Sequence, residues 1–555
     1  MKILFSRIVF VVLIVANAEL IGQVSAPPPS QAPLTEQYKR VTEYYLEALS
    51  VIRANHVGGS RLKVDELTTA SIDSMVHILD PHSAFLDAKE AAQARAELNA
   101  QYFGIGATIS DLRDRRFDVI ATFIRFPYRN SPASRAGLRY GDKIVEINGV
   151  SMLGMTSSET RKHLLGARGS NVKVIVERSG RRLAFDIVRD AIAQPSISDA
   201  YIIRPRVGYI ALTAGISSDL GGEFRRTLTK LKAEGIDYLI LDLRNNGGGL
   251  VTQACILVDE LIPKGQLIFQ TVARRKEGSR VCISPNDAPD ETPIVALANH
   301  LTVSAAEFIV AGLQDTDRAL IVGENTFGKG ISQGIFDLDG GTRLQLTVSR
   351  FQTASGRRTQ RDYSGESLYK YYTQGVRRDA EPANVASQPA FKTPAGRIKY
   401  GGNGVTPDVV VEPNMFPKDT SRNTQARIQS STFAFSIELT SGRIRNFENL
   451  GIAGVPDYDY ILKGDEFLIN EELFQAYKQF AIENYGLQSK EIDQLHTQIA
   501  RSIRNELVTA AYGVSSALRL ANEFDPQLQK AFEVLPQARE LLQRSKGARV
   551  AKARE

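Results

Sequence analysis

Cysteine is scarce in this chain of 555 residues, which contains only Cys255 and Cys282. Two cysteines cannot build a disulfide framework or a multi-cysteine metal site; they either pair with each other or stay buried as thiols. The sequence also has no H-E-x-x-H segment, so the common zinc-peptidase signature is absent. We therefore expect neither a metal nor an organic cofactor.

The chain also has only a small excess of positive over negative charge. The formal net charge of +6 is small for this length, and much of the visible basicity lies in the terminal segment RSKGARVAKARE. Such a segment is typical of a solvated chain end, so we do not expect nucleic acid as a partner. The hydrophobic fraction of 43% and the charged fraction of 23% are those of a globular protein. The length predicts several domains.

The first residues contain no apolar run long enough to cross a bilayer comfortably. Lys2 and Arg7 precede the short apolar run at residues 8–15, and the small residues Ala16 and Ala18 follow it. This order is typical of a signal peptide. We assign residues 1–26 to a signal peptide and the start of a linker. We expect an exported, periplasmic protein that is soluble after signal cleavage, with membrane association as the alternative.

Changes in composition and in the spacing of apolar residues along the chain predict a multidomain α/β protein. Residues 35–100 have helical spacing and few glycines, so they predict a helical N-terminal region. Residues 101–191 predict a small β-rich domain of short strands and glycine turns. Strands and helices alternate over residues 196–413, apart from a polar insertion at 356–404, which predicts an α/β core. Residues 414–555 predict a helical C-terminal region.

A glycine loop begins the β-rich domain. The loop consists of Phe103, Gly104, Ile105 and Gly106, and the segment AGLRYGDKIVEING follows it at residues 136–149. The combination resembles a PDZ domain. This resemblance implies that backbone N–H groups of the loop bind the terminal carboxylate of a peptide, and that the peptide adds a strand to the sheet edge.

Ser304 and Lys329 are the candidate catalytic residues of the α/β core. Ser304 follows an apolar strand and begins a predicted helix, where backbone N–H groups lack acceptors; alone, this is typical of a helix N-cap. Lys329 lies among glycines and apolar residues, where burial would lower its pKa from about 10.4 and leave a neutral amine able to accept a proton. Gln333 would orient that amine by a hydrogen bond without adding charge.

Three segments together resemble the carboxyl-terminal processing peptidases, also called tail-specific proteases. They are DLRNNGGG at residues 242–249, NHLTVSAAEFIVAGLQD at 299–315 and VGENTFGKGISQG at 322–334. Lys329 lies twenty-five positions after Ser304, and Gln333 four positions after Lys329, which is the spacing of that family's catalytic set. The resemblance extends from LDPHSAFL at residues 79–86 to GVTPD at 404–408.

This resemblance implies a crotonase- or Clp-like α/β core and an exported serine endopeptidase. Ser304 would be the nucleophile, Lys329 the base and Gln333 the orienting residue. The implied partners are proteins or peptides with free C-termini, and a homo-oligomer or an adaptor protein stays open as a further partner. His82 is expected to be a buried hydrogen-bonding residue, and His300 is expected to be structural or peripheral.

Donors for the developing oxyanion are needed beside the nucleophile. We predict the backbone N–H groups of Ala305 and Gly248. The family usually has proline where this chain has Gly247, so Gly249 remains an alternative to Gly248.

Other interpretations are weaker. The segment from Gly323 to Lys329 has the start of a phosphate-binding P-loop, but Gly330 stands where a serine or threonine should hold Mg²⁺. A crotonase-like acyl-CoA enzyme would leave the PDZ-like domain without a purpose. The main alternative is a catalytically silent secreted PDZ scaffold, against which Ser304, Lys329 and Gln333 argue.

Overall fold

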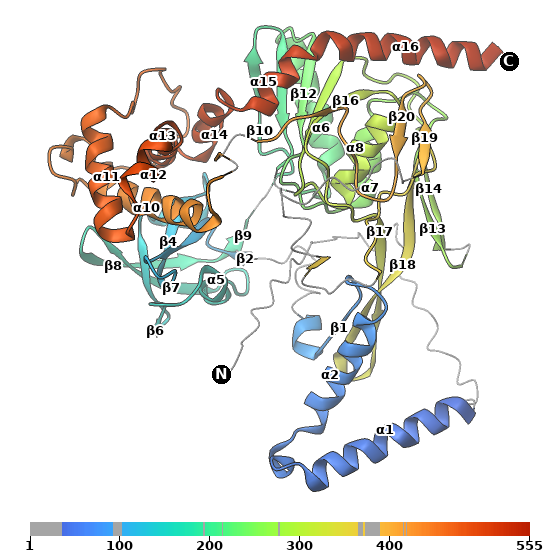
Figure 1. Ribbon diagram of the computed structural model, residues 1–555, viewed down its shortest axis with the longest axis horizontal. Coiled ribbons are helices and arrows are strands. Elements are labelled where there is room, and N and C mark those ends of the chain that lie inside the picture. Colours follow the sequence, from blue (N-terminus) through green and yellow to red (C-terminus); the bar gives the residue numbers. More distant parts are fainter. Residues whose placement is uncertain are drawn as a thin grey trace. The chain divides into compact units, whose positions relative to one another are not determined.

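A computed structural model describes residues 36–92, 103–192, 195–213, 215–275, 278–364, 370–371, 389–413, 416–417 and 419–554 (Figure 1). The predicted signal peptide and part of the predicted insertion at 356–404 lie outside these residues. The chain forms two compact units. One contains residues 1–99, 195–411 and 531–555, and the other contains residues 100–194 and 412–530.

A six-stranded sheet forms the centre of the first unit. Its strands, in spatial order, are β10 (Asp199–Arg204), β11 (Val207–Ala211), β12 (Tyr238–Asp242), β15 (Ile294–Ala298), β16 (Ala319–Gly323) and β21 (Val409–Val410). All neighbours from β11 to β21 are parallel, and β10 pairs antiparallel with β11. The strands β11 and β15 are buried throughout, which is typical of parallel strands covered on both faces.

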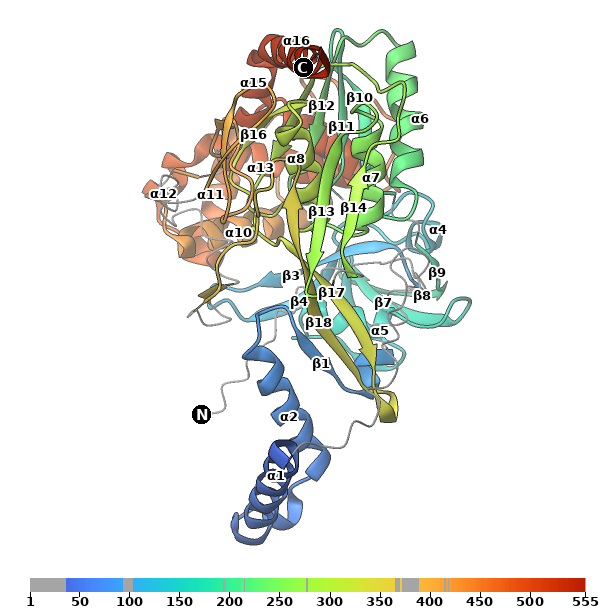
Figure 2. The ribbon, with the colours of Figure 1, turned by 90° about the vertical axis from the view of Figure 1, so that its right-hand side faces the viewer.

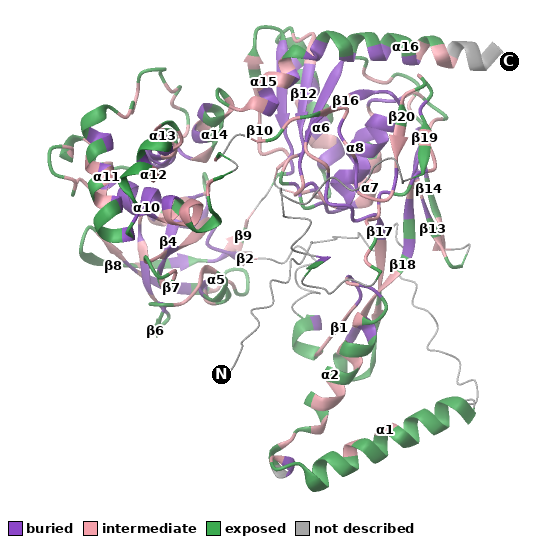
Figure 3. Cartoon of the chain, viewed as in Figure 1, coloured by how far each residue is buried: buried purple, intermediate pink, exposed green. Residues whose placement is uncertain are grey.

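Helices cover this sheet. They are α6 (Leu220–Ala233), α7 (Val251–Asp259), α8 (Ala305–Asp315) and α16 (Leu535–Arg554). Every residue of α8 is buried, so this helix lies inside the unit (Figure 3). The chain reaches α16 through α15 (Pro526–Glu533).

The last helix, α16, contacts β15 and β16 through an apolar face that includes Ala538 and Leu541 (Figure 1). The sequence predicts residues 414–555 as one helical region, but this region is divided between the two units. Residues 531–555 belong to the first unit because this apolar face covers the sheet.

A second sheet of the first unit carries a long hairpin. Its strands are β1 (Ala84–Leu86), β18 (Arg343–Thr353), β13 (Leu267–Ala273) and β14 (Arg280–Ile283), with β17 (Ile331–Asp337) paired to β18. Figure 2 shows β1 lying along the β17–β18 hairpin. The helices α1 (Glu36–Asn55) and α2 (Val64–His77) precede β1, and α1 has no buried residue. A two-stranded sheet pairs β19 (Ala390–Lys392) with β20 (Ile398–Tyr400). None of the helices within the described residues is both long and apolar enough to cross a membrane.

The second unit joins a β-rich domain to a helical bundle. The main strands are β3 (Ala107–Arg113), β4 (Val119–Pro127), β5 (Lys143–Ile147), β7 (Asn171–Arg178) and β8 (Arg181–Val188), with β6 (Val150–Ser151) beside β5. The short strands β2 (Phe103–Gly104) and β9 (Asp190–Ala191) pair with each other, and the short helices are α4 (Pro132–Ala136) and α5 (Ser157–Leu164). The bundle contains α10 (Arg422–Thr440), α11 (Glu471–Tyr485), α12 (Ser489–Gln494), α13 (His496–Tyr512) and α14 (Val514–Asn522).

These two parts share one hydrophobic core. Phe123 of β4 packs edge-on against Phe433 of α10, with 6.2 Å between the ring centroids. Glu506 of α13 is buried, accepts a hydrogen bond from the Tyr140 hydroxyl at 2.8 Å and forms an ion pair with Arg125. The sequence predicts the two parts as separate regions, but their buried contacts make them one compact body.

Candidate active site

Ser304 lies in a tight turn between β15 and α8. Its backbone angles are φ 58° and ψ −121°, and its side chain is buried. A positive φ is strained for a residue with a side chain, and such strain is concentrated at functional sites. Serine nucleophiles of unrelated hydrolases also lie in a strained strand-to-helix turn. Ser304, the candidate nucleophile, therefore lies in a strained turn between a strand and a helix.

A glycine loop after β12 lies directly against this turn. A Cβ atom added to Gly248 would lie 2.7 Å from the Val303 carbonyl oxygen, 2.9 Å from Ser304 Cβ and 3.1 Å from Ala305 N. Gly248 also has φ 91°. Only glycine allows this close approach with this backbone conformation. The structure thus brings Gly248 and Ala305 together beside Ser304.

Asn246 holds the glycine loop in place. Its side chain is completely buried, its Oδ1 accepts the Gly248 N–H at 2.8 Å, and its Nδ2 donates to the Leu212 carbonyl oxygen. Its own carbonyl oxygen accepts the Val303 N–H at 2.9 Å, so it joins the loop to the serine turn. The sequence analysis missed this residue. The sequence feature that could have indicated its role is the position of a polar residue between a buried strand and three glycines.

The bond to Asn246 changes the choice of oxyanion donors. The Gly248 N–H, which the sequence predicts as a donor, is already used by Asn246 because the carboxamide folds back onto its own loop. The Gly249 N–H donates no hydrogen bond among the described residues. The Ala305 N–H belongs to the first residue of α8 and has no acceptor within the helix. Ala305 and Gly249 thus keep N–H groups without an acceptor among the described residues, and the choice of the glycine donor stays a prediction.

Lys329 lies in the loop between β16 and β17 and is only 5% exposed. Burial lowers the pKa of Lys329 to about 8, while the negative charges of Glu307 and Asp80 act in the opposite direction. Among the described residues no carboxylate forms an ion pair with Lys329 Nζ, and Glu307 and Asp80 act on it only through their charge. With a pKa of about 8, roughly one Lys329 in ten is neutral at pH 7.

Glu307 connects the backbones of the two candidate catalytic residues. Its Oε2 accepts the N–H groups of Ser304 and Lys329, each at 2.8 Å. Its Oε1 accepts the Gly328 N–H at 2.7 Å and the Thr326 hydroxyl at 2.6 Å. Burial raises the pKa of Glu307, and these four hydrogen bonds oppose the increase. Because amide N–H groups can only donate, this arrangement suits the ionised carboxylate.

Sequence reasoning also missed Glu307. The signal was a carboxylate three residues after Ser304, in a helix whose other nearby residues are apolar or small. A buried charge is costly unless it has partners, so a charged residue at such a position indicates a specific role.

Gln333 lies on β17 and makes no hydrogen bond through its side chain. Its Nε2 and Oε1 atoms are both buried and lack partners among the described residues. The predicted bond from Gln333 to the lysine amine is therefore not formed in this conformation. Its orienting role stays a prediction.

Ser332, the neighbour of Gln333, lies in the segment GISQG, which has the G-x-S-x-G spacing of hydrolase nucleophiles. Its hydroxyl, however, is hydrogen-bonded to the Ser349 hydroxyl on β18. Ser332 lies within strand β17 and not in a strand-to-helix turn. This serine is therefore structural.

The loop before β1 borders the lysine. His82 is buried, and its Nε2 lies 3.0 Å from the Tyr371 hydroxyl. Burial, together with the positive charges of Lys329 and Arg361, lowers the pKa of His82 to about 3. His82 is therefore neutral and structural, as expected. The His300 Nδ1 atom lies 3.3 Å from Glu324 Oε2.

The predicted peptide-binding loop begins the sheet of the second unit. Phe103 and Gly104 form β2, Ile105 is buried, and Gly106 has φ 72°. A Cβ atom on Gly106 would lie 2.5 Å from Ser131 Cβ, so glycine is required there. The loop leads into β3, which within the described residues is an edge strand paired only with β4 and is contacted by α5 and α10. An open edge beside a helix is the geometry that strand addition needs.

The described part of the chain contains no recognisable metal-binding site. No group of three or more His, Cys, Asp or Glu side chains there is placed to hold a metal ion.

Comparison with known proteins identifies both parts of this arrangement. A family model described as peptidase family S41 matches residues 206–365, and a PDZ domain model matches residues 123–178. The carboxy-terminal-processing protease of Bartonella bacilliformis is 31% identical over 296 residues, which cover 52% of this chain and 66% of the relative. The carboxy-terminal processing protease CtpA of Bacillus subtilis is 30% identical over 348 residues, covering 62% of this chain and 70% of the relative.

Thus the chain spans about two thirds of the length of these relatives. A solved photosystem II D1 C-terminal processing protease aligns with 68% of this chain and 94% of its own, with a TM-score of 0.36 and 24% identity. The family resemblance of the three sequence segments is confirmed. The chain belongs to peptidase family S41, among the carboxy-terminal processing proteases, and carries a PDZ domain.

Proposed function

We propose that the protein is a serine endopeptidase in which Ser304 is the nucleophile and Lys329 is the base. The observation that carries this proposal is the carboxylate of Glu307, which accepts the backbone N–H groups of both residues through one oxygen atom. This contact supports the proposal because it joins the strained serine turn to a buried lysine that has no ion-pair partner among the described residues. The glycine loop beside Ser304 supplies room for a substrate backbone.

The proposed reaction begins with neutral Lys329 accepting the proton of the Ser304 hydroxyl. Ser304 Oγ then attacks the peptide carbonyl carbon, and the Ala305 N–H with a glycine N–H stabilises the tetrahedral oxyanion. The Lys329 ammonium group protonates the leaving amine as the C–N bond breaks. Water, deprotonated by the same lysine, hydrolyses the acyl-enzyme. Gln333 gains a partner for its buried amide when the lysine amine turns toward it.

The proposed substrates are proteins with accessible C-termini. The loop at residues 103–106 binds the terminal carboxylate, and the peptide extends the sheet along β3 beside α5. Main-chain hydrogen bonds of this kind accept many sequences. The open edge of β3 supports this mode of binding.

A fluorophosphonate probe tests the serine assignment directly. We expect the probe to label Ser304, identified by peptide mass spectrometry, at a rate that rises with pH and is half-maximal near pH 8. The reason is that only neutral Lys329 activates the serine, and burial lowers the pKa of Lys329 to about 8. Below that value the rate should fall about tenfold per pH unit.

Two controls separate the enzyme from a silent PDZ scaffold. Ser304→Ala should take up no label. Lys329→Ala should be labelled slowly at every pH below the range in which hydroxide itself drives the labelling. A scaffold without a working site would react no faster than a denatured sample. Labelling that is independent of pH between 6 and about 9 contradicts the role of Lys329.

We also propose that the protein is exported. Cys255 of α7 and Cys282 of β14 form a disulfide, and disulfides persist in oxidising compartments. We expect cell fractionation to recover a mature chain that has lost its first residues, in the periplasmic fraction, with neither cysteine reactive toward maleimide until it is reduced. A full-length cytosolic chain with two reactive thiols would contradict this proposal.

A further inference from the structure

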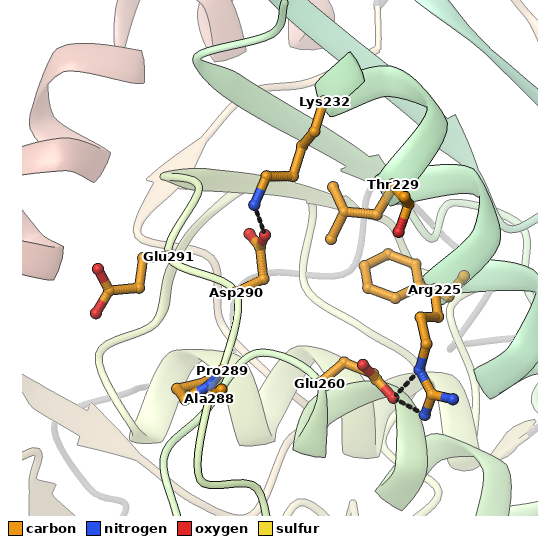
Figure 4. A pocket seen from close by; sticks show the side chains of 10 residues that line it. Arg225, Thr229, Lys232, Glu260, Ala288, Pro289, Asp290 and Glu291 are labelled. Carbon is orange, nitrogen blue, oxygen red and sulfur yellow. Dashed lines mark hydrogen bonds and ion pairs between the residues drawn. The ribbon is translucent and has the colours of Figure 1, made fainter. Parts of the chain in front are cut away.

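Two neighbouring hollows on the first unit differ in how their charges are balanced. Both are lined in part by Pro289, Asp290 and Glu291, in the segment before β15. The larger, of about 510 Å³, contains two cations, and each has a carboxylate partner (Figure 4). Lys232 Nζ lies 2.6 Å from Asp290 Oδ2, and Arg225 is paired with Glu260. Both cations of this hollow are thus already paired, so neither is available to bind an anionic ligand.

The smaller hollow, of about 300 Å³, is lined in part by an arginine, Arg318, that forms no ion pair among the described residues. Arg318 is 1% exposed. Its Nε donates to the Leu261 carbonyl oxygen at 2.8 Å, and its Nη2 donates to the carbonyl oxygens of Asp290 at 2.9 Å and Thr292 at 2.7 Å. Its Nη1 is buried and has no hydrogen-bond partner among the described residues. All of its partners are thus neutral carbonyl groups.

A second arginine, Arg549 of α16, lines the same hollow. Its Nη2 donates to the Ser545 hydroxyl one turn earlier, and its Nε is buried without a partner among the described residues. Each of these guanidinium groups therefore keeps one buried N–H group unsatisfied. A buried N–H group without an acceptor costs about 1–3 kcal/mol, and more when it is charged.

The carboxylates around this hollow are already neutralised by lysines. Asp290 is paired with Lys232, and Glu291 Oε2 lies 2.6 Å from Lys546 Nζ. Asp317, whose negative charge also acts on Arg549, is paired with Arg397. Among the described residues no carboxylate therefore forms an ion pair with Arg318 or Arg549, and the carboxylates of Asp290, Glu291 and Asp317 act on them only through their charge. Two such charges facing one hollow repel each other, and the addition of an anion relieves that repulsion.

We propose that this hollow binds a small oxyanion, the carboxylate or phosphate group of a ligand, between Arg318 and Arg549. A planar guanidinium group matches the oxygens of both groups and forms shorter, stronger hydrogen bonds with them than with neutral acceptors. Leu261, Pro263 and Leu542 also line the hollow and can contact an apolar body attached to the anion.

The position of the site gives the bound anion a structural effect. Arg549 belongs to α16, whereas Arg318 lies three residues after the last residue of α8. The anion would therefore fasten the C-terminal helix to the sheet. Ser304 is at the other end of α8, about 16 Å away by the rise of a helix of 11 residues, so this site is separate from the active site.

The test uses the full chain with two probes, inorganic phosphate and isovalerate, and with chloride at equal ionic strength as the reference. We expect at least one probe to bind saturably in calorimetry, to raise the unfolding temperature above that in chloride, and to slow hydrogen exchange of α16. Tighter binding of phosphate assigns the site to phosphate groups, and tighter binding of isovalerate assigns it to organic carboxylates.

Arg549→Gln is the decisive variant because Arg318 is fully buried and its replacement endangers folding. We expect Arg549→Gln to weaken binding of the better probe at least about tenfold. The matched control is Arg544→Gln, which alters an exposed arginine of the same helix that lines neither hollow, and it should bind as the wild type does. Failure of both probes to bind, or wild-type affinity in Arg549→Gln, overturns the proposal.

Discussion

Replacing Ser304 or Lys329 by alanine is expected to lower kcat/KM by at least about 10⁴-fold toward a fluorogenic peptide with a free C-terminus. Ser304→Ala removes the only atom that can form the acyl-enzyme. Lys329→Ala removes the group that accepts its proton. Because the two residues act as one unit, the double variant should be no less active than either single variant.

Folding controls separate this loss from structural damage. Lys329 is buried and has no carboxylate partner in the described part of the chain, so its removal breaks no ion pair there. The thermal unfolding of both variants should therefore stay close to that of the wild type. Binding of a C-terminal peptide should also persist, because the PDZ domain belongs to the other compact unit. Wild-type turnover in both variants would exclude the proposed pair.

Chemical rescue sharpens the assignment of Lys329. The alanine variant leaves a space where the side chain was, and methylamine can supply the missing amine. We expect methylamine to restore part of the activity of Lys329→Ala in proportion to the neutral amine present, and to restore none in Ser304→Ala. Equal rescue of both variants would point to a contaminating peptidase.

Local patterns along the chain predict that Ser304 begins a helix and that Lys329 lies among apolar neighbours. Their catalytic roles are predicted from the resemblance to the carboxyl-terminal processing peptidases and from the shared spacing with Gln333. An apolar strand, a serine and an apolar helix follow one another at residues 294–315, and the structure has β15, Ser304 and α8 there. Lys329 lies among glycines and apolar residues, and the structure buries it. Both features depend on near neighbours in sequence, which is why periodicity and composition could indicate them.

Contacts between distant segments were not predictable in this way. Glu307 is recognisable as a charge on an apolar helix, but its acceptance of the Gly328 and Lys329 N–H groups depends on how β16 lies beside α8. Asn246 similarly accepts the Val303 N–H, a bond that joins the segments following the adjacent parallel strands β12 and β15. The common core of β4 and α10 and the return of α16 to the sheet also join segments hundreds of residues apart, and a helical pattern does not say which surface it will cover.

Glu307→Gln is expected to lower kcat/KM by about 10²-fold to 10³-fold, because Glu307 positions both the nucleophile and the base. The carboxylate accepts four hydrogen bonds, three of them from N–H groups that cannot reverse direction. A glutamine amide has one oxygen and one NH₂ group, so at least one of these donors loses its acceptor and faces another donor. We expect the free energy of unfolding to fall by about 3 kcal/mol, measured by urea denaturation.

The pH dependence distinguishes positioning of the lysine from a general loss of stability. The negative charge of Glu307 favours the ammonium form of Lys329 and so raises its pKa, against the larger effect of burial. Glutamine removes that charge, so the pKa of Lys329 should fall below about 8 and the rising limb of the pH–rate profile should move to lower pH. Glu324→Gln is the matched control, because Glu324 faces His300 and does not contribute to the lysine pKa. A profile that stays in place or moves to higher pH would show that Glu307 stabilises the fold without influencing the base.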